Sequence, residues 1–157
     1  MRDVILILHN IRSLHNVGSI FRTADGAGVK KIYLVGITPE PTDRLGRVRE
    51  PLRKVALGAE ESVPWEKVSS FARLSKKMRE EGYSMCALEQ SKNSINYTKL
   101  PRSKKKIALL VGNEVDGVPS TILKSCDYVL EIPMKGKKES LNVGVATGIA
   151  LFRIMNP

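Results

Sequence analysis

The amino-acid sequence predicts an α/β protein with a largely parallel β-sheet flanked by helices. Short apolar runs of strand length alternate with segments whose apolar residues recur at helical spacing. The first run, Val4 to Leu8, is continuously apolar, as expected for a strand covered on both faces. With 157 residues, the chain is long enough to bury a core and is expected to form a single domain, residues 1–157.

The beginning of the chain is expected to form a strand–helix–strand unit. Polar residues 9–16 are predicted to form a loop, and the apolar residues from 17 to 27 have helical spacing. Gly28 then ends the helix, and Lys31 to Val35 forms the second strand. Strands in this arrangement predict a right-handed parallel crossover.

The middle of the chain is less regular. Residues 36–58 show little periodicity and contain several Pro and Gly residues, which predicts a long charged loop. Loops of this length in compact domains are usually functional or disordered. The remaining elements are expected as a short strand at 63–65, an amphipathic helix at 65–81, a strand at 83–88, a polar connection at 89–106, a strand at 107–111, a short helix at 119–124, a strand at 128–132 and a closing helix at 142–155.

The closing helix has an unusual composition. Residues 143–152 have hardly any polar face, which predicts a buried helix rather than a surface helix. Pro133 ends the strand before it, and a small polar loop leads to Ser140 and Asn142 at the helix entrance. Ser140 is predicted to cap the helix through its hydroxyl, and the free N–H groups of a helix start also suit a polar or anionic ligand.

The charge of the chain favours a polyanionic partner. Its formal net charge is +10 and its pI is near 9.8, a balance typical of proteins that contact nucleic-acid phosphates. A soluble protein that happens to be basic is the alternative, and solvated charge explains any one basic run. Three clusters are expected to flank the site: Arg44, Arg47, Arg49, Arg53 and Lys54; Arg102, Lys104, Lys105 and Lys106; and Lys135, Lys137 and Lys138.

Several classes of protein are disfavoured. Cys86 and Cys126 lack metal-ligand spacing and are expected to be buried free thiols in a reducing cytoplasm, so no metal is predicted. Polar residues interrupt the early apolar run, which argues against a signal peptide. No apolar stretch approaches the roughly 20 residues that span a bilayer, so no membrane is expected.

Ligands of parallel sheets bind beyond the carboxyl ends of the strands. The candidate segments are therefore those after Leu88, Val111 and Ile132. After Val111, Gly112 would let a ligand ring approach the backbone, and Glu114 stands where carboxylates often act on ligands. A turn with a capping acid explains this segment about as well.

A further candidate lies at the start of the first helix. Asn16 or Ser19 could simply cap that helix, and Gly18 allows a close backbone approach. Arg22 lies within the first two turns among apolar neighbours, where its fork of donors could hold a phosphate or a carboxylate. A structural salt bridge is the alternative for Arg22.

In this order and spacing, three segments resemble the motifs of the SpoU/TrmH group of the SPOUT RNA methyltransferases. They are residues 16–23 (Asn-Val-Gly-Ser-Ile-Phe-Arg-Thr), residues 111–118 (Val-Gly-Asn-Glu-Val-Asp-Gly-Val) and residues 132–143 (Ile-Pro-Met-x-Gly-x-x-x-Ser-Leu-Asn-Val). The resemblance extends from Ile5 to Ile154. One departure is Gly144, where the family often has Ser.

The resemblance implies a SPOUT fold with a C-terminal deep trefoil knot, in roughly residues 107–157, that binds S-adenosylmethionine. It also implies a homodimer with the active site at the subunit interface, and methylation of a ribose 2′-hydroxyl of tRNA or rRNA. No separate RNA-binding domain is expected in residues 1–157, although many relatives carry one. The implied cofactor site comprises Leu88, Glu89, Val111, Gly112, Asn113, Glu114, Ile132, Met134, Ser140, Leu141 and Asn142.

The resemblance also makes Arg22 the central catalytic residue, reaching the site from the other subunit. Because the pKa of arginine lies above roughly 12, Arg22 is expected to grip a phosphate and orient the 2′-hydroxyl rather than act as a base. Asn16, Glu114, Ser140 and Asn142 are expected to complete the hydrogen-bond network. The alternatives are a catalytically silent RNA-binding homologue and a nucleotide-binding oxidoreductase, and the latter would need a Gly-x-Gly-x-x-Gly turn after the first strand.

Overall fold

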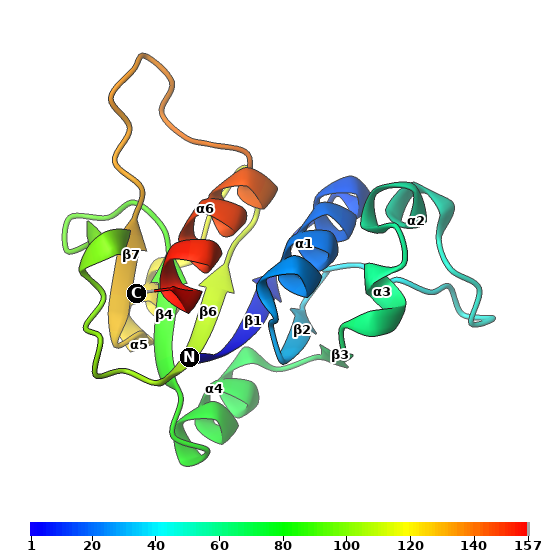
Figure 1. The fold of residues 1–157 in the computed structure, drawn as a ribbon, viewed down its shortest axis with the longest axis horizontal. Helices are drawn as coiled ribbons and strands as arrows, with labels where there is room; N and C mark the ends of the chain where they lie inside the picture. Colours follow the sequence, from blue (N-terminus) through cyan, green and yellow to red (C-terminus); the bar gives the residue numbers. More distant parts are fainter. Residues whose placement is uncertain (157) are drawn as a thin grey trace.

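The computed structural model, which describes residues 1–156, contains a seven-stranded β-sheet with helices on both faces (Figure 1). The strands lie in the order β3-β2-β1-β6-β4-β7-β5, and every neighbouring pair is parallel. This arrangement confirms the predicted α/β class. The strands are β1 (Asp3–His9), β2 (Lys31–Val35), β3 (Trp65–Val68), β4 (Ser84–Leu88), β5 (Ile95–Asn96), β6 (Lys106–Val111) and β7 (Tyr128–Glu131).

Six α-helices and one 3₁₀ turn connect the strands within residues 1–156. They are α1 (Leu14–Ala27), α2 (Glu50–Ala56), α3 (Ala59–Ser62), α4 (Phe71–Glu80), η1 (Tyr97–Lys99), α5 (Ser120–Ser125) and α6 (Val143–Met155). The hydroxyl of Ser13 caps α1 by accepting from the N–H of Asn16. Gly28 ends the same helix in the left-handed conformation, as its position in the sequence predicts.

The sheet is buried on both faces. On one face, Leu6 and Leu8 belong to a core shared with Phe21 of α1 and Ile154 of α6. On the other, alternate residues of β1 pack with α4, in a core that includes Leu74 and Met78. Because neither face of the central strands meets water, these strands are continuous apolar runs in the sequence.

The predicted loop at 36–58 is wrong in part, because it contains α2 and ends next to α3. Leu52 and Ala56 are the buried residues of α2, and Pro51 lies in its first turn. The backbone of α2 lies so close to α1 that a Cβ at Gly18 would lie 2.7 Å from the carbonyl oxygen of Leu52. A helix with only two buried positions gives almost no periodic signal.

The predicted helix at 65–81 is also wrong at its start. Trp65–Val68 is strand β3, paired with β2, and α4 begins after its cap, Ser70. Trp65 and Val68 are three residues apart, a spacing that also fits a helix. The predicted polar connection at 89–106 contains β5 and η1, and α1 starts at Leu14 inside the predicted loop at 9–16. The short strand predicted at 63–65 overlaps β3 only at Trp65, because β3 continues to Val68. The remaining predicted elements agree with the structure to within about two residues.

The expectation of a fully buried closing helix is wrong for this chain alone. One side of α6 packs against α1, where a Cβ at Gly148 would contact the side chain of Thr23 at 3.5 Å. The other side leaves Val145, Ile149 and Phe152 exposed by 52%, 39% and 49%. The absence of a polar face therefore corresponds to an apolar surface stripe.

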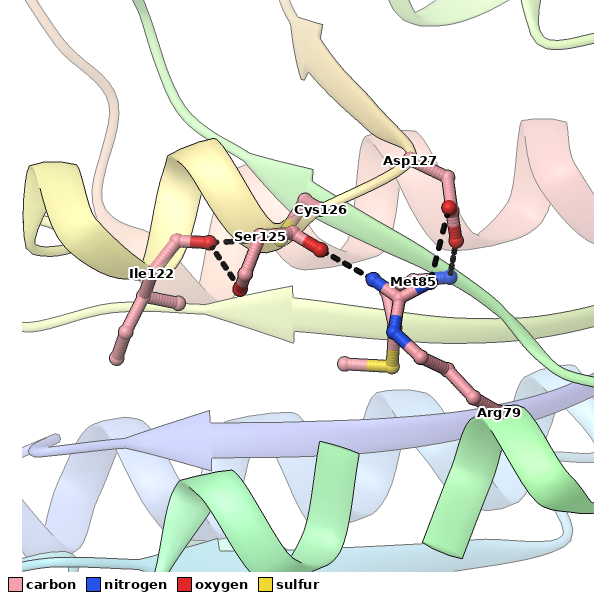
Figure 2. Close-up of polar contacts among 6 residues, drawn as sticks. All are labelled: Arg79, Met85, Ile122, Ser125, Cys126 and Asp127. Carbon is pink, nitrogen blue, oxygen red and sulfur yellow. Dashed lines mark hydrogen bonds and ion pairs between the residues drawn. The ribbon is translucent and has the colours of Figure 1, made fainter. Parts of the chain in front are cut away.

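The amino ends of the strands are joined by polar contacts between helices and strands (Figure 2). The carboxylate of Asp127, just before β7, accepts from the N–H of Met85 at 2.7 Å and pairs with Arg79 of α4 at 3.0 Å. Arg79 also donates to the carbonyl of Ser125 at the end of α5. These contacts connect α4, α5, β4 and β7 at the edge where each of these strands begins.

Arg2 makes a second junction at this edge. Arg2 is 5% exposed, and its guanidinium donates to four backbone carbonyls. The acceptors are Lys104 at 2.9 Å, Pro101 at 2.8 Å, Leu100 at 3.4 Å and Ile154 at 3.0 Å. The side chain therefore links the segment before β6 to the last turn of α6.

Candidate active site

A cavity of about 440 Å³ lies at the carboxyl ends of β4, β6 and β7. It is bordered by the long loop that leads into α6, drawn in orange in Figure 1. The three segments predicted after Leu88, Val111 and Ile132 meet there. Every residue of the implied cofactor site lines this cavity. The lining residues are Asn16, Leu88, Glu89, Gln90, Val111, Gly112, Asn113, Glu114, Val115, Gly117, Glu131, Ile132, Met134, Ser140, Leu141, Asn142, Val143 and Ala146.

The turn after β6 explains the glycine at its start. A Cβ at Gly112 would lie 2.6 Å from the carbonyl carbon of Gly117, which allows no side chain. Asn113 shapes the turn because its Oδ1 accepts from the N–H groups of Val115 and Asp116. The tight turn itself therefore requires a glycine at position 112, whatever ligand the cavity binds.

Glu114 connects this turn to the start of α1. Its carboxylate accepts from the N–H groups of Arg12 and Ser13, each at 3.0 Å, and from the Asn16 amide at 3.0 Å. Partial burial opposes ionisation, but the hydrogen bonds from Arg12, Asn16 and Ser13 outweigh it and hold the pKa of Glu114 below its ordinary value. The ionised carboxylate of Glu114 therefore fixes the start of α1 to the turn after β6. This agrees with the alternative that Glu114 is a capping acid.

A second amide extends this network to α6. Asn142 donates to Oδ1 of Asn16 at 3.0 Å, and its own Oδ1 accepts from the N–H groups of Gly144 and Val145. The cap of α6 is therefore Asn142, and the prediction that Ser140 caps it is wrong, because Asn142 immediately precedes the helix. Ser140 is exposed on the cavity wall, and its side chain makes no hydrogen bond within residues 1–156.

Arg22 lies outside the cavity. It is exposed on α1 and does not line the cavity, and within residues 1–156 its side chain forms neither an ion pair nor a hydrogen bond. The alternative prediction, that Arg22 forms a structural salt bridge, is therefore wrong. Its neighbour Thr23 contacts α6 at Gly148, so Arg22 lies beside the contact between the two helices.

The three basic clusters do not all flank the cavity, contrary to the prediction. Lys135, Lys137 and Lys138 are exposed on the loop that forms its wall. The cluster at 102–106 immediately precedes β6 and so lies at the opposite, amino edge of the sheet. The cluster at 44–54 follows β2, two strands from β6. The cluster at 102–106 directly precedes the strand predicted at 107–111, so the predicted order of elements already implied the amino edge.

The cluster at 44–54 is also partly neutralised. Arg47 pairs with Asp43 at 2.9 Å, and Arg53 pairs with Glu50 at 3.3 Å. Both pairs are solvent-exposed and contribute little to stability. Hydrogen bonds from the Arg47 and Leu45 backbone, with that from the Arg47 side chain, hold the pKa of Asp43 below its ordinary value.

Sequence reasoning missed several residues of the cavity. Gln90 is the second residue after the end of β4, so the rule that located Glu89 would also have found it. No sequence signal marked Ala146, because it reaches the cavity only through the way α6 packs in the fold.

The two cysteines lie outside the cavity. Cys86 is buried and Cys126 is only half-buried, so the prediction of buried free thiols is confirmed in full for Cys86 alone. Burial raises the pKa of Cys86 to about 12 and that of Cys126 to about 11.

Comparison with known proteins places this fold and cavity in one family. The SpoU rRNA Methylase family model matches residues 3–152. The chain belongs to the SpoU rRNA methylase family. Over 152 residues it is 36% identical to the 23S rRNA (guanosine-2′-O-)-methyltransferase RlmB of Salmonella typhi, which covers 96% of this chain and 59% of the relative. The RlmB of Escherichia coli K12 is 35% identical over 149 residues, 94% of this chain and 58% of that one. The chain thus spans under two-thirds of the length of these curated relatives.

Solved structures agree with this membership. The A. aeolicus TrmH/SpoU tRNA modifying enzyme has a TM-score of 0.83 and 31% identity, covering 99% of this chain and 75% of that one. An AdoMet-bound rRNA methyltransferase from Sinorhizobium meliloti has a TM-score of 0.88 and 28% identity, with coverages of 98% and 56%. A structure concerned with the 2-OH methylation of C/U34 on tRNA has a TM-score of 0.79 and 25% identity, with coverages of 99% and 91%.

Two further features of residues 1–156 bear on the class of site. None of their helices combines the length and apolarity that crossing a membrane requires. The same residues contain no group of three or more His, Cys, Asp or Glu side chains arranged to hold a metal ion.

Proposed function

We propose that this protein transfers a methyl group from S-adenosylmethionine to a ribose 2′-hydroxyl of tRNA or rRNA. The observation that carries the proposal is the cavity at the carboxyl ends of β4, β6 and β7, where the three family-like segments meet. Relatives described as 2′-O-methyltransferases and as AdoMet-bound support the reaction and the methyl donor.

The residues around the cavity fit S-adenosylmethionine. Its volume of about 440 Å³ lies within the roughly 300–1,000 Å³ of small-molecule sites. Leu88, Ile132, Met134 and Leu141 offer apolar walls for an adenine, and the amide of Asn113 and the hydroxyl of Ser140 are polar groups on the same lining. When bound, S-adenosylmethionine supplies an electrophilic methyl group. We propose that a trefoil knot in roughly residues 107–157, of which the structure describes 107–156, holds it within a single domain.

Arg22 is proposed to act from the partner subunit, since in its own chain it lies outside the cavity. Its planar fork of donors suits the phosphate beside the target ribose, and this grip would orient the 2′-hydroxyl. Asn16, Glu114 and Asn142 are already engaged with one another. Their proposed role is therefore to hold the two helix starts at the site, while Ser140 has a free hydroxyl for substrate or cofactor.

The exposed side of α6 is the proposed dimer surface. Val145, Ile149 and Phe152 expose a contiguous apolar stripe, a feature typical of protein interfaces. Ile149→Asp should convert a dimer to monomers in sedimentation experiments. Leu45→Asp is the control, because Leu45 is 75% exposed but lies on a distant loop. A wild-type monomer, or an unchanged Ile149→Asp dimer, would contradict this surface.

RNA contacts are proposed to come from the basic clusters, with Lys135, Lys137 and Lys138 nearest to the cavity. Phosphate contacts release counterions, so the logarithm of RNA affinity should fall steeply with the logarithm of salt concentration. Replacing these three lysines with Gln should reduce the slope by about 2 to 3. A salt-independent affinity would argue against phosphate-driven binding. A cytoplasmic location follows from such a substrate and remains part of the proposal.

The decisive experiment combines calorimetry with S-adenosylmethionine and mass spectrometry of nucleosides from RNA of cells with and without the protein. We expect cofactor binding and the loss of a 2′-O-methyl nucleoside when the protein is absent. Arg22→Ala should keep cofactor affinity and fold while turnover falls about 100-fold or more, since oriented groups contribute several kcal/mol. Normal turnover in folded Arg22→Ala would refute the role of Arg22.

A further inference from the structure

Two consecutive residues after β4 contact both loops that form the sides of the cavity. Glu89 Oε2 accepts from the N–H of Val118 at 3.0 Å, in the loop that follows β6. Gln90 Nε2 donates to the carbonyl oxygen of Glu139 at 2.7 Å, in the loop that follows β7. The end of β4 is therefore attached to one loop on each side of the cavity.

The contact at Glu139 is notable because the loop around it has little other support. Residues 133–141 make no backbone–backbone hydrogen bond to the rest of the described chain. Residues 135–139 are all exposed, yet Met134, Ser140 and Leu141 line the cavity. Within residues 1–156, the amide of Gln90 makes the one side-chain hydrogen bond that joins this stretch to the rest of the protein. Beyond it, the next fixed point is Asn142.

We propose that Gln90 is a positioning residue for the methyl donor: its amide holds residues 133–141 against the cavity and so sets the affinity for S-adenosylmethionine. The inference rests on the function proposed above. A loop that is already held loses less conformational entropy when a ligand binds, and the gain appears chiefly as slower ligand release. Gln90 itself performs no chemistry in this role.

The test compares Gln90→Glu with Glu139→Ala. Gln90→Glu keeps the size of the side chain but removes the donor and places a carboxylate against a carbonyl oxygen. Glu139→Ala keeps the contact, because the accepting atom belongs to the backbone and the Glu139 side chain is exposed. The net contribution of one such hydrogen bond corresponds to about a five-fold change in affinity.

We expect Gln90→Glu to weaken S-adenosylmethionine binding in calorimetry by about five-fold or more. The same loss should appear in the KM for S-adenosylmethionine rather than in turnover at saturation, and Glu139→Ala should bind like the wild type. Equal affinity of Gln90→Glu and wild type, or an equal loss in Glu139→Ala, overturns the inference. Wild-type protein that binds no S-adenosylmethionine overturns the proposed function instead, and with it the assignment of Gln90 to the methyl donor.

Limited proteolysis without cofactor provides an independent measurement. Trypsin cleavage at the Lys135–Gly136 bond reports opening of the loop and lies far enough from position 139 to be insensitive to that side chain. Cleavage should be several-fold faster in Gln90→Glu than in wild type or Glu139→Ala. Thermal unfolding should be unchanged, because the hydrogen bond between Gln90 and the backbone of Glu139 is exposed. Identical cleavage rates in Gln90→Glu and wild type would show that the amide does not hold the loop.

Discussion

The two ends of the parallel sheet are built differently. At the carboxyl ends, residues 133–141 make no backbone–backbone hydrogen bond to the rest of the described chain and form a wall of the cavity. At the amino ends, the guanidinium of Arg2 is buried among four carbonyls, and Asp127 joins Arg79 to β4. The first arrangement leaves groups available for a ligand, whereas the second engages Arg2, Arg79 and Asp127 in contacts within the protein. Stability should therefore depend on the amino end and cofactor affinity on the carboxyl end.

The largest expected effect at the amino end is that of Arg2→Met. Met keeps most of the apolar stem but leaves four buried or partly buried carbonyls without their donor, which should lower the free energy of unfolding by about 3 kcal/mol. Urea denaturation measures this loss. The affinity of the remaining folded protein for S-adenosylmethionine should not change, because Arg2 lies at the opposite edge from the cavity.

Arg79→Met is the matched control at the same edge. The side chains of Arg79 and Asp127 are 41% and 37% exposed, and an exposed pair contributes about 1 kcal/mol or less. If Arg79→Met lowered the free energy of unfolding as much as Arg2→Met does, burial would not be what distinguishes the two junctions. If Arg2→Met weakened cofactor binding in the folded protein, the division between the two ends would fail.

A smaller effect is expected at the carboxyl end from Glu114→Gln. The amide places an N–H group against donors from Arg12, Ser13 or Asn16, so the free energy of unfolding at pH 7 should fall by about 1–2 kcal/mol. Cofactor affinity should fall as well, because Asn16 is no longer fixed against Asn142. Unlike Arg2→Met, this substitution changes both quantities.

The pH dependence of the Glu114→Gln effect has a definite sign. The pKa of Glu114 is lower in the folded protein than in the unfolded chain, so its stabilisation is fully present above the unfolded value of about 4.3 and is lost as pH falls through the folded value. The difference between wild type and Glu114→Gln in urea denaturation should therefore shrink below about pH 4. A difference that is constant from pH 7 to acid would mean that the carboxylate charge is not what the network requires.

The sequence identifies buried features better than exposed ones. The central strands and the end of α1 were predictable because both faces of the sheet are apolar and because Gly28 terminates the helix. The three cavity segments were also predictable, from strand ends and from family resemblance. In contrast, α2 has only Leu52 and Ala56 to mark it, and the Asn142 cap was assigned to Ser140, because both polar side chains precede the same apolar run.

The exposed stripe of α6 shows a further limit of the sequence. Residues that avoid water in an assembly and residues that avoid it in a single chain have the same composition, so Val145 and Ile149 were expected to be buried. In contrast, the amino-edge position of the cluster at 102–106 could have been inferred, because the cluster directly precedes the strand predicted at 107–111. Whether one side of an apolar helix is buried within its own chain depends on how the helix packs, which local patterns do not encode.

The smallest expected effect compares two glycines on α6. A Cβ at Gly144, at the carboxyl end of the sheet, would lie 3.1 Å from Ser19 Oγ and 3.2 Å from Asn142 Oδ1, whereas one at Gly148 meets only Thr23 at 3.5 Å. Alanine gains about 1 kcal/mol of helix propensity at either position. At Gly148 this gain should appear as a small rise in the urea midpoint, because the contact is an ordinary one.

At Gly144 the new methyl must displace the Ser19 hydroxyl or the capping amide of Asn142, so Gly144→Ala should be less stable than Gly148→Ala by about 1 kcal/mol. It should also weaken cofactor binding, since Asn142 lies on the cavity, whereas Gly148→Ala should not. Adding Ser19→Gly to Gly144→Ala relieves the shorter contact and should recover part of the loss. Equal behaviour of the two alanine variants would show that the α1–α6 contact is no tighter at the cavity than one turn further along the helix.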